Sequence, residues 1–112
     1  MGACTFGQTE IGKFKNVGEA YRAAQEEANH EEGHNPYNGT ISTCTSLSVA
    51  RNAPRFGTQA FDKFEDKLLD DLGKRECLYV ELTGAALQKR KPNYLKGKKG
   101  VKGYYFFGWA AE

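Results

Sequence analysis

Residues 103–111 read GYYFFGWAA, and this stretch decides which fold the rest of the chain can form. Apolar side chains occupy both odd and even positions, so both faces of an extended strand would be apolar. Such a strand is typical of the interior of a sheet that is covered on both sides. We therefore expect residues 104–109 and 78–82 to form the interior strands, paired through the connection between them.

Two segments have the periodicity of amphipathic helices. Residues 17–32 follow a capping Asn16 and carry a stripe made mostly of alanine, which predicts close packing against a neighbour. Residues 58–72 are the second predicted helix, and Thr58 is its expected cap. Their predicted buried stripe consists of Phe61, Phe64, Leu68, Leu69 and Leu72. Of these, Phe61, Phe64, Leu68 and Leu72 are expected in the core with Tyr105, Phe107 and Trp109.

Two further segments read as strands. Residues 4–14 form an irregular strand or a bent pair, and Gly7 and Gly12 indicate a bulge or a sheet edge. Residues 40–49 alternate between an Ile41/Leu47 face and a face of serine and cysteine. The order β-α-β-α-β-β predicts a single α+β domain over residues 1–112. We expect a mainly antiparallel sheet of about four strands with two helices packed on one face.

Composition limits the classes of protein that the chain can belong to. Its 112 residues are enough for one hydrophobic core, and three cysteines without paired spacing favour free thiols in a reducing compartment. No apolar run is long enough to span a membrane, and the first residues do not resemble a signal peptide. We expect a cytoplasmic protein.

One motif has the form of a metal site. His30-Glu31-Glu32-Gly33-His34 matches H-E-x-x-H, in which two histidines one helical turn apart bind zinc. The helical phase turns both histidines away from the alanine stripe, Gly33 ends the helix inside the motif, and no third ligand stands out. The prediction is therefore no metal and no cofactor, with a small zinc-dependent hydrolase using His30 and His34 as an alternative.

No catalytic residue set is recognised in the sequence, and the charge distribution favours a binding protein over an enzyme. Residues 89–112 carry a net charge of +6, whereas residues 1–88 carry −4. Clustered lysines around an aromatic suit phosphate contact and base stacking, and backbone N–H groups of a tight turn can bind an anion. The predicted ligand-binding residues are Tyr37, Asn38, Gly39, Thr40, Tyr94, Lys96, Lys98, Lys99 and Lys102.

The chain also resembles a group of small bacteriophage and prophage proteins of unknown function. The resemblance is carried by a Gly-x3-Tyr-x-Gly-Thr-Ile turn and by a closing Phe-Gly-Trp-Ala. The matching residues are Gly33, Tyr37, Gly39, Thr40 and Ile41, then Phe107, Gly108, Trp109 and Ala110. The resemblance implies a protein that acts on a process of an infected or lysogenic bacterial host, for instance by countering a defence.

These observations combine into one expected function with open alternatives. We expect a small non-enzymatic binding protein whose partner is an anionic, nucleotide-like molecule or an acidic host protein surface. A nucleic-acid-binding module that uses residues 89–102 is an alternative. The oligomeric state stays open, with a homodimer through the apolar closing strand as one option.

Overall fold

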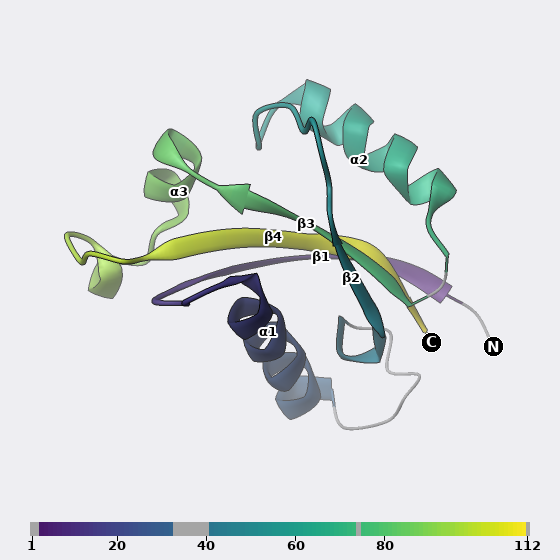
Figure 1. Ribbon diagram of the computed structural model, residues 1–112, viewed down its shortest axis with the longest axis horizontal. Coiled ribbons are helices and arrows are strands. Elements are labelled where there is room, and N and C mark those ends of the chain that lie inside the picture. The colour runs from purple at the N-terminus through teal and green to yellow at the C-terminus, as the bar shows by residue number, and fades with distance from the viewer. Residues whose placement is uncertain (1–2, 33–40, 74, 112) are drawn as a thin grey trace.

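The computed structural model describes residues 3–32, 41–73 and 75–111, which form a sheet with helices around it (Figure 1). The strands are β1 (Ala3–Gly12), β2 (Ser46–Val49), β3 (Glu76–Leu82) and β4 (Lys102–Ala111). The helices are α1 (Val17–Glu32), α2 (Gln59–Asp71) and α3 (Gly84–Arg90), with short 3-10 turns η1 (Ile41–Thr43) and η2 (Asn93–Leu95). The expected α+β class is confirmed.

The closing strand β4 lies inside the sheet. The strand order is β1-β4-β3-β2, with β4 antiparallel to both β1 and β3 and with β2 parallel to β3. The expected four-stranded, mainly antiparallel sheet is therefore confirmed, and so are its interior strands. Gly108 permits the close pairing of β3 and β4, since a Cβ atom there would collide with the backbone carbonyl oxygen of Glu76.

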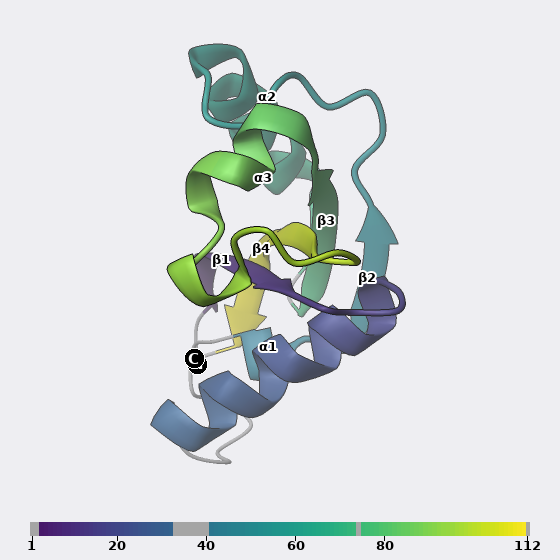
Figure 2. The same ribbon diagram turned by 90° about the vertical axis from the view of Figure 1, so that its left-hand side faces the viewer.

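The two long helices lie on opposite faces of the sheet (Figure 2). Tyr104 and Phe106 pack against the alanines of α1, whereas Tyr105 and Phe107 pack on the α2 side. The expectation that both helices cover one face was wrong. Its physical reason is visible in β4 itself: a strand that is aromatic on both faces needs a covering layer on each.

Both helices begin where the sequence predicts. The Asn16 side chain accepts a hydrogen bond from the Glu19 N–H at 3.1 Å, and the Glu19 carboxylate accepts one from the Lys15 N–H at 3.1 Å. Thr58 caps α2 by accepting from the Phe61 N–H at 3.2 Å. These caps satisfy N–H groups that have no partner inside the helix.

The predicted core residues are buried to different degrees. Phe61 and Phe107 are fully buried. The other five are half-buried: Phe64, Leu68, Leu72, Tyr105 and Trp109. The two residues of this group that carry a polar group on the ring form hydrogen bonds. The Trp109 Nε1–H donates to the Leu69 carbonyl at 2.7 Å, and the Tyr105 hydroxyl donates to Glu65 at 2.7 Å.

The segment 40–49 is not one strand. Residues 41–43 form η1 and only Ser46–Val49 form β2, so the expected alternation of two faces over ten residues was wrong. The reason is the contact with α1. The Gln25 side chain donates to the carbonyls of Ile41 and Cys44, and the Tyr21 hydroxyl also donates to Cys44. These bonds satisfy backbone carbonyls that a continuous strand would have placed in the sheet.

The structure also shows how the basic stretch after β3 and the N-terminal strand are folded. The basic stretch that follows β3 contains α3 and η2, although the sequence reads only as a long connection. The N-terminal strand β1 forms one edge of the sheet, which is one of the two features that Gly7 and Gly12 indicated. The expectation of an irregular strand or a bent pair was wrong, because β1 pairs with β4 without interruption from Ala3 to Gly12. Within the described ranges, no helix combines the length and apolarity that a membrane crossing requires.

Candidate functional site

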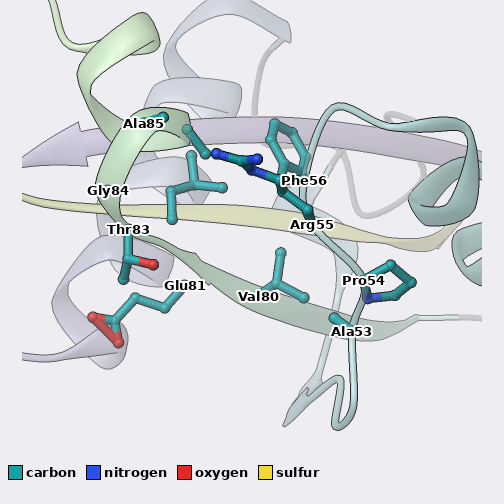
Figure 3. Close-up of a pocket in the computed structure, with 11 residues that line it drawn as sticks. Ala53, Pro54, Arg55, Phe56, Val80, Glu81, Thr83, Gly84 and Ala85 are labelled. Atoms are coloured by element: carbon teal, nitrogen blue, oxygen red, sulfur yellow. The ribbon is translucent and has the colours of Figure 1, made fainter.

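Two adjoining cavities form a groove between the segment that precedes α2 and the start of α3 (Figure 3). Their volumes are about 410 and 300 Å³. They share four lining residues, Arg55, Phe56, Ala85 and Ala86. The first extends to Val80–Thr83 at the end of β3, and the second extends to Thr58, Lys89 and Arg90. We call this surface the α3 groove.

The topology explains why a groove forms here. Strands β2 and β3 are parallel, so their carboxyl ends meet at the same edge of the sheet. The chain leaves β2 through residues 50–58, and it leaves β3 directly into α3 through Gly84, whose φ is +55°. The two connections that leave these strands therefore lie side by side and line the groove.

Phe56 forms the aromatic wall of the α3 groove. Its ring centroid lies 4.8 Å from that of Tyr105 and 5.0 Å from that of Phe61, so the ring is fixed to the α2-side core. The Arg90 guanidinium lies over the same ring, 4.4 Å from its centroid. An aromatic face and a cation are therefore held together at one point of the groove.

Arg90 is positioned by its neighbours. One guanidinium nitrogen donates to the Ala86 carbonyl at 3.1 Å within α3. The other lies beside Gly57, where a Cβ atom would stand 3.0 Å from it. The φ of Gly57 is +88°, a conformation that favours glycine. A guanidinium carries five N–H donors, so Arg90 keeps donors for a ligand.

The groove is basic. Arg55, Lys89 and Arg90 line it, and Glu81 is the acidic residue among those that line the two cavities. Figure 3 shows the Arg55 side chain beside the Phe56 ring, with the Glu81 carboxylate at the far end of the cavity. Three cations that line one cavity can bind a phosphate or carboxylate, and the planar Arg90 guanidinium can also stack on a planar group.

The residues predicted from the sequence lie elsewhere. Tyr94 is 75% exposed on η2, and Lys96, Lys98 and Lys99 are exposed in the turn after it. Lys102 is half-buried at the start of β4, where its Nζ donates to the Lys15 carbonyl at 3.4 Å. None of these five lines the α3 groove. The predicted turn Tyr37, Asn38, Gly39 and Thr40 lies outside the described residues.

Sequence reasoning missed Arg55 and Phe56, which belong to none of the predicted helices, strands or sites. The available signal was the run Pro54-Arg55-Phe56-Gly57 directly before the capping Thr58. Lys89 and Arg90 were part of the predicted basic segment 89–102. They were not among the predicted site residues, because the lysines that cluster around Tyr94 were chosen instead.

The zinc alternative is only partly visible. His30 is exposed in the last turn of α1, and His34 lies outside the described residues. In the parts of the chain that the structure describes, no three His, Cys, Asp or Glu side chains are arranged to hold a metal ion.

One carboxyl pair lies away from the groove. Burial, together with a hydrogen bond to Glu27 of α1 and the charge of that residue, raises the pKa of Glu10 to about 7. Gln8, which also contacts Glu10, opposes this rise. The pair joins β1 to α1 and lies on the sheet face opposite α2, so we assign it to stability rather than to the α3 groove.

Comparison of the chain with protein families, with curated proteins and with solved structures found no match.

Proposed function

We propose that the protein is a non-enzymatic binding protein for an anionic, nucleotide-like ligand, which occupies the α3 groove. The observation that carries the proposal is that Arg55, Lys89 and Arg90 line the same cavity as Phe56, with the Arg90 guanidinium over the Phe56 ring. These residues come from two segments more than thirty positions apart in the chain. The ligand's phosphate would accept hydrogen bonds from Arg55 and Lys89, and its planar base would stack on the Arg90 guanidinium, which lies over the Phe56 ring.

The size and shape of the groove favour a small molecule over a protein surface. The two cavities have volumes of about 410 and 300 Å³, within the range of small-ligand sites. An acidic protein face would need a broader, flatter contact region. The segment with Tyr94 and the exposed lysines is separate from these cavities, and a nucleic-acid module built on it is the rival proposal.

The phage resemblance gives the proposal a biological setting. A small protein that acts in the cytoplasm of an infected bacterium could counter a defence by sequestering a nucleotide signal. This role requires tight binding and no turnover. A groove that offers cations and an aromatic ring is suited to such binding.

The test is a thermal-shift and calorimetric screen over inorganic phosphate, mononucleotides, cyclic dinucleotides and short oligonucleotides. A ligand at 100 times its dissociation constant stabilises the folded state by ~2.7 kcal/mol. We expect such a shift for one nucleotide class. The variant Arg55→Ala/Lys89→Ala should abolish it, and the matched variant Lys98→Ala/Lys99→Ala removes the same charge outside the groove and should keep it.

Three outcomes would overturn the proposal. The first is that no nucleotide class shifts the melting temperature. The second is that the Lys98/Lys99 variant loses as much affinity as the groove variant, which would move the site to the basic turn. The third is binding of any oligonucleotide with a slope near one unit per phosphate contact in log affinity against log salt, which would identify a nucleic-acid module.

A further inference from the structure

A third cavity continues the α3 groove toward β1. It has a volume of about 480 Å³ and is lined by residues 9–11 of β1 together with Arg90 and Pro92. Arg90 also lines the second cavity, whereas the first and second cavities share Ala85 and Ala86 near the start of α3. The three cavities therefore follow α3 in order, from the end of β3 to the edge strand β1.

The positive charge is concentrated in the middle of this row. Arg55, Lys89 and Arg90 line the second cavity, and none of the described residues around it is acidic. Each outer cavity has one cation and one carboxylate among its lining residues, Arg55 with Glu81 in the first and Arg90 with Glu10 in the third. A phosphate is therefore favoured in the middle cavity, and the two outer cavities suit groups without charge.

The first cavity contains a stretch of strand without a partner. The register between β2 and β3 ends at Tyr79, whose carbonyl accepts a hydrogen bond from the Ala50 N–H at 2.9 Å, while β3 continues beyond this point. Alternate residues of β3 face away from β4, so the N–H and C=O of Glu81 lie on the same side as the Tyr79 carbonyl. They point toward the segment 53–55, which forms the opposite wall of the cavity (Figure 3).

The third cavity also contains an unpaired strand edge. Among the described strands, β1 pairs only with β4, so alternate residues of β1 direct their N–H and C=O groups away from the sheet. Residues 9–11 are consecutive, so at least one of them presents both groups at the cavity. Nucleobases carry neighbouring donors and acceptors on their edges, and proteins read them by hydrogen bonds and stacking. Both outer cavities therefore offer what a base requires.

We propose that the ligand of the α3 groove is a dinucleotide, two nucleosides joined through phosphate, with the phosphate in the middle cavity and one base in each outer cavity. This inference rests on the proposed function and specifies its ligand. One base stacks on the Arg90 guanidinium in the third cavity, and the other meets the Glu81 backbone in the first.

A dinucleotide fits the three cavities better than a mononucleotide does. A mononucleotide in the middle and third cavities would leave the first cavity, of about 410 Å³, without a ligand group. A longer phosphate chain on the mononucleotide would bring negative charge toward Glu10 or Glu81, which line the outer cavities. A second nucleoside brings no charge and can hydrogen-bond to the unpaired backbone.

The experiment is isothermal titration calorimetry of the full chain with a purine mononucleotide and with linear and cyclic dinucleotides of the same base. We expect one dinucleotide per chain, bound at least tenfold more tightly than the mononucleotide, because the second base binds as part of the same molecule. The linear and cyclic ligands show which connection between the nucleosides the groove accepts.

Two variants block one outer cavity each, since among the three cavities Ala53 lines only the first and Thr9 only the third. Ala53→Trp should lower the dinucleotide affinity about tenfold, to that of the mononucleotide, and leave the mononucleotide affinity unchanged. Thr9→Trp should lower both affinities. The matched variants Ala60→Trp and Thr5→Trp add the same ring at exposed positions outside the three cavities and should change neither. Circular dichroism checks that each variant is folded.

The outcomes separate failure of this inference from failure of the proposed function. If no nucleotide of any kind binds, both are wrong. The dinucleotide assignment alone is wrong if mononucleotides bind as tightly as dinucleotides, if two mononucleotides bind per chain, or if Ala53→Trp leaves the dinucleotide affinity unchanged. An oligonucleotide that binds more tightly than either dinucleotide would also overturn it and would show that the groove binds a single strand.

Discussion

The two faces of the sheet are packed by different means. On one face the alanines of α1, Ala20, Ala24 and Ala28, meet the rings of Tyr104 and Phe106. On the other face the rings of Phe61 and Phe107 meet each other, with centroids 6.3 Å apart. Small side chains against large ones allow a helix to approach closely. Large side chains packed against each other form an aromatic cluster that extends to the end of the sheet.

This difference explains where the groove is. The α2-side cluster continues from Phe107 through Tyr105 to Phe56, and Phe56 is the wall of the α3 groove. The α1 side has a closed alanine interface, and its hydrogen bonds from Gln25 and Tyr21 tie η1 to the helix. One face therefore serves mainly to hold the sheet together, while the other also shapes the candidate site.

The largest expected effect comes from the neighbouring residues Phe106 and Phe107, which point to opposite faces and are both 0% exposed. Phe106→Ala and Phe107→Ala should each lower the free energy of unfolding by ~3–5 kcal/mol, measured by urea denaturation. Phe106→Ala should cost the more, because alanines cannot move to fill the cavity. A larger loss in Phe107→Ala would contradict this contrast, and exposed Tyr94→Ala is the control.

The second prediction tests the closeness of the alanine interface. Ala24 is 0% exposed, so Ala24→Leu should force α1 away from the sheet and lower the free energy of unfolding by ~1–3 kcal/mol. Ala60→Leu makes the same change at an exposed position of α2 and should stay within ~0.5 kcal/mol of the unmodified chain. If both variants unfold at the same urea concentration as the unmodified chain, the α1 interface is loose.

A smaller effect is expected at Trp109, whose N–H anchors the last turn of α2. Trp109→Phe keeps an aromatic ring and removes the hydrogen bond to the Leu69 carbonyl, which still accepts one from the Leu72 N–H. The melting temperature should fall by the equivalent of ~0.5–1.5 kcal/mol. Trp109→Ala also removes the ring and should fall further. No change in Trp109→Ala would show that this side chain does not contribute to the core.

The last expected effect is a dependence on pH. The pKa of Glu10 is raised from 4.5 to about 7 in the folded state, so the folded state binds a proton more tightly than the unfolded state. The corresponding stability is present below pH 4.5 and is lost as the pH rises to about 7. Glu10→Gln should flatten this part of the stability profile, and Glu27→Gln should flatten it less, because burial is the largest cause of the raised pKa. Exposed Glu26→Gln should leave the slope in place, and an unchanged slope in Glu10→Gln would refute the assignment.

Much of the fold was accessible from local patterns. The helices at 17–32 and 58–72 were predictable because capping side chains and helical periodicity act within a few residues. The prediction for the segment 40–49 was wrong because contacts over a longer distance in the sequence decide its structure. Its alternation indicated one strand, but hydrogen bonds from α1, sixteen or more positions away, hold residues 41–43 in a turn.

The sequence by itself determined the interior strand, the helix boundaries and the excess of positive charge near the end of the chain, because these follow from residue type and short-range spacing. Only the tertiary structure decided which helix covers which face and that Phe56 meets Arg90. Thirty-four positions separate these two residues, and they come together because β2 and β3 run parallel with α2 between them. No short-range pattern encodes that contact, because it depends on the order of strands in the completed sheet.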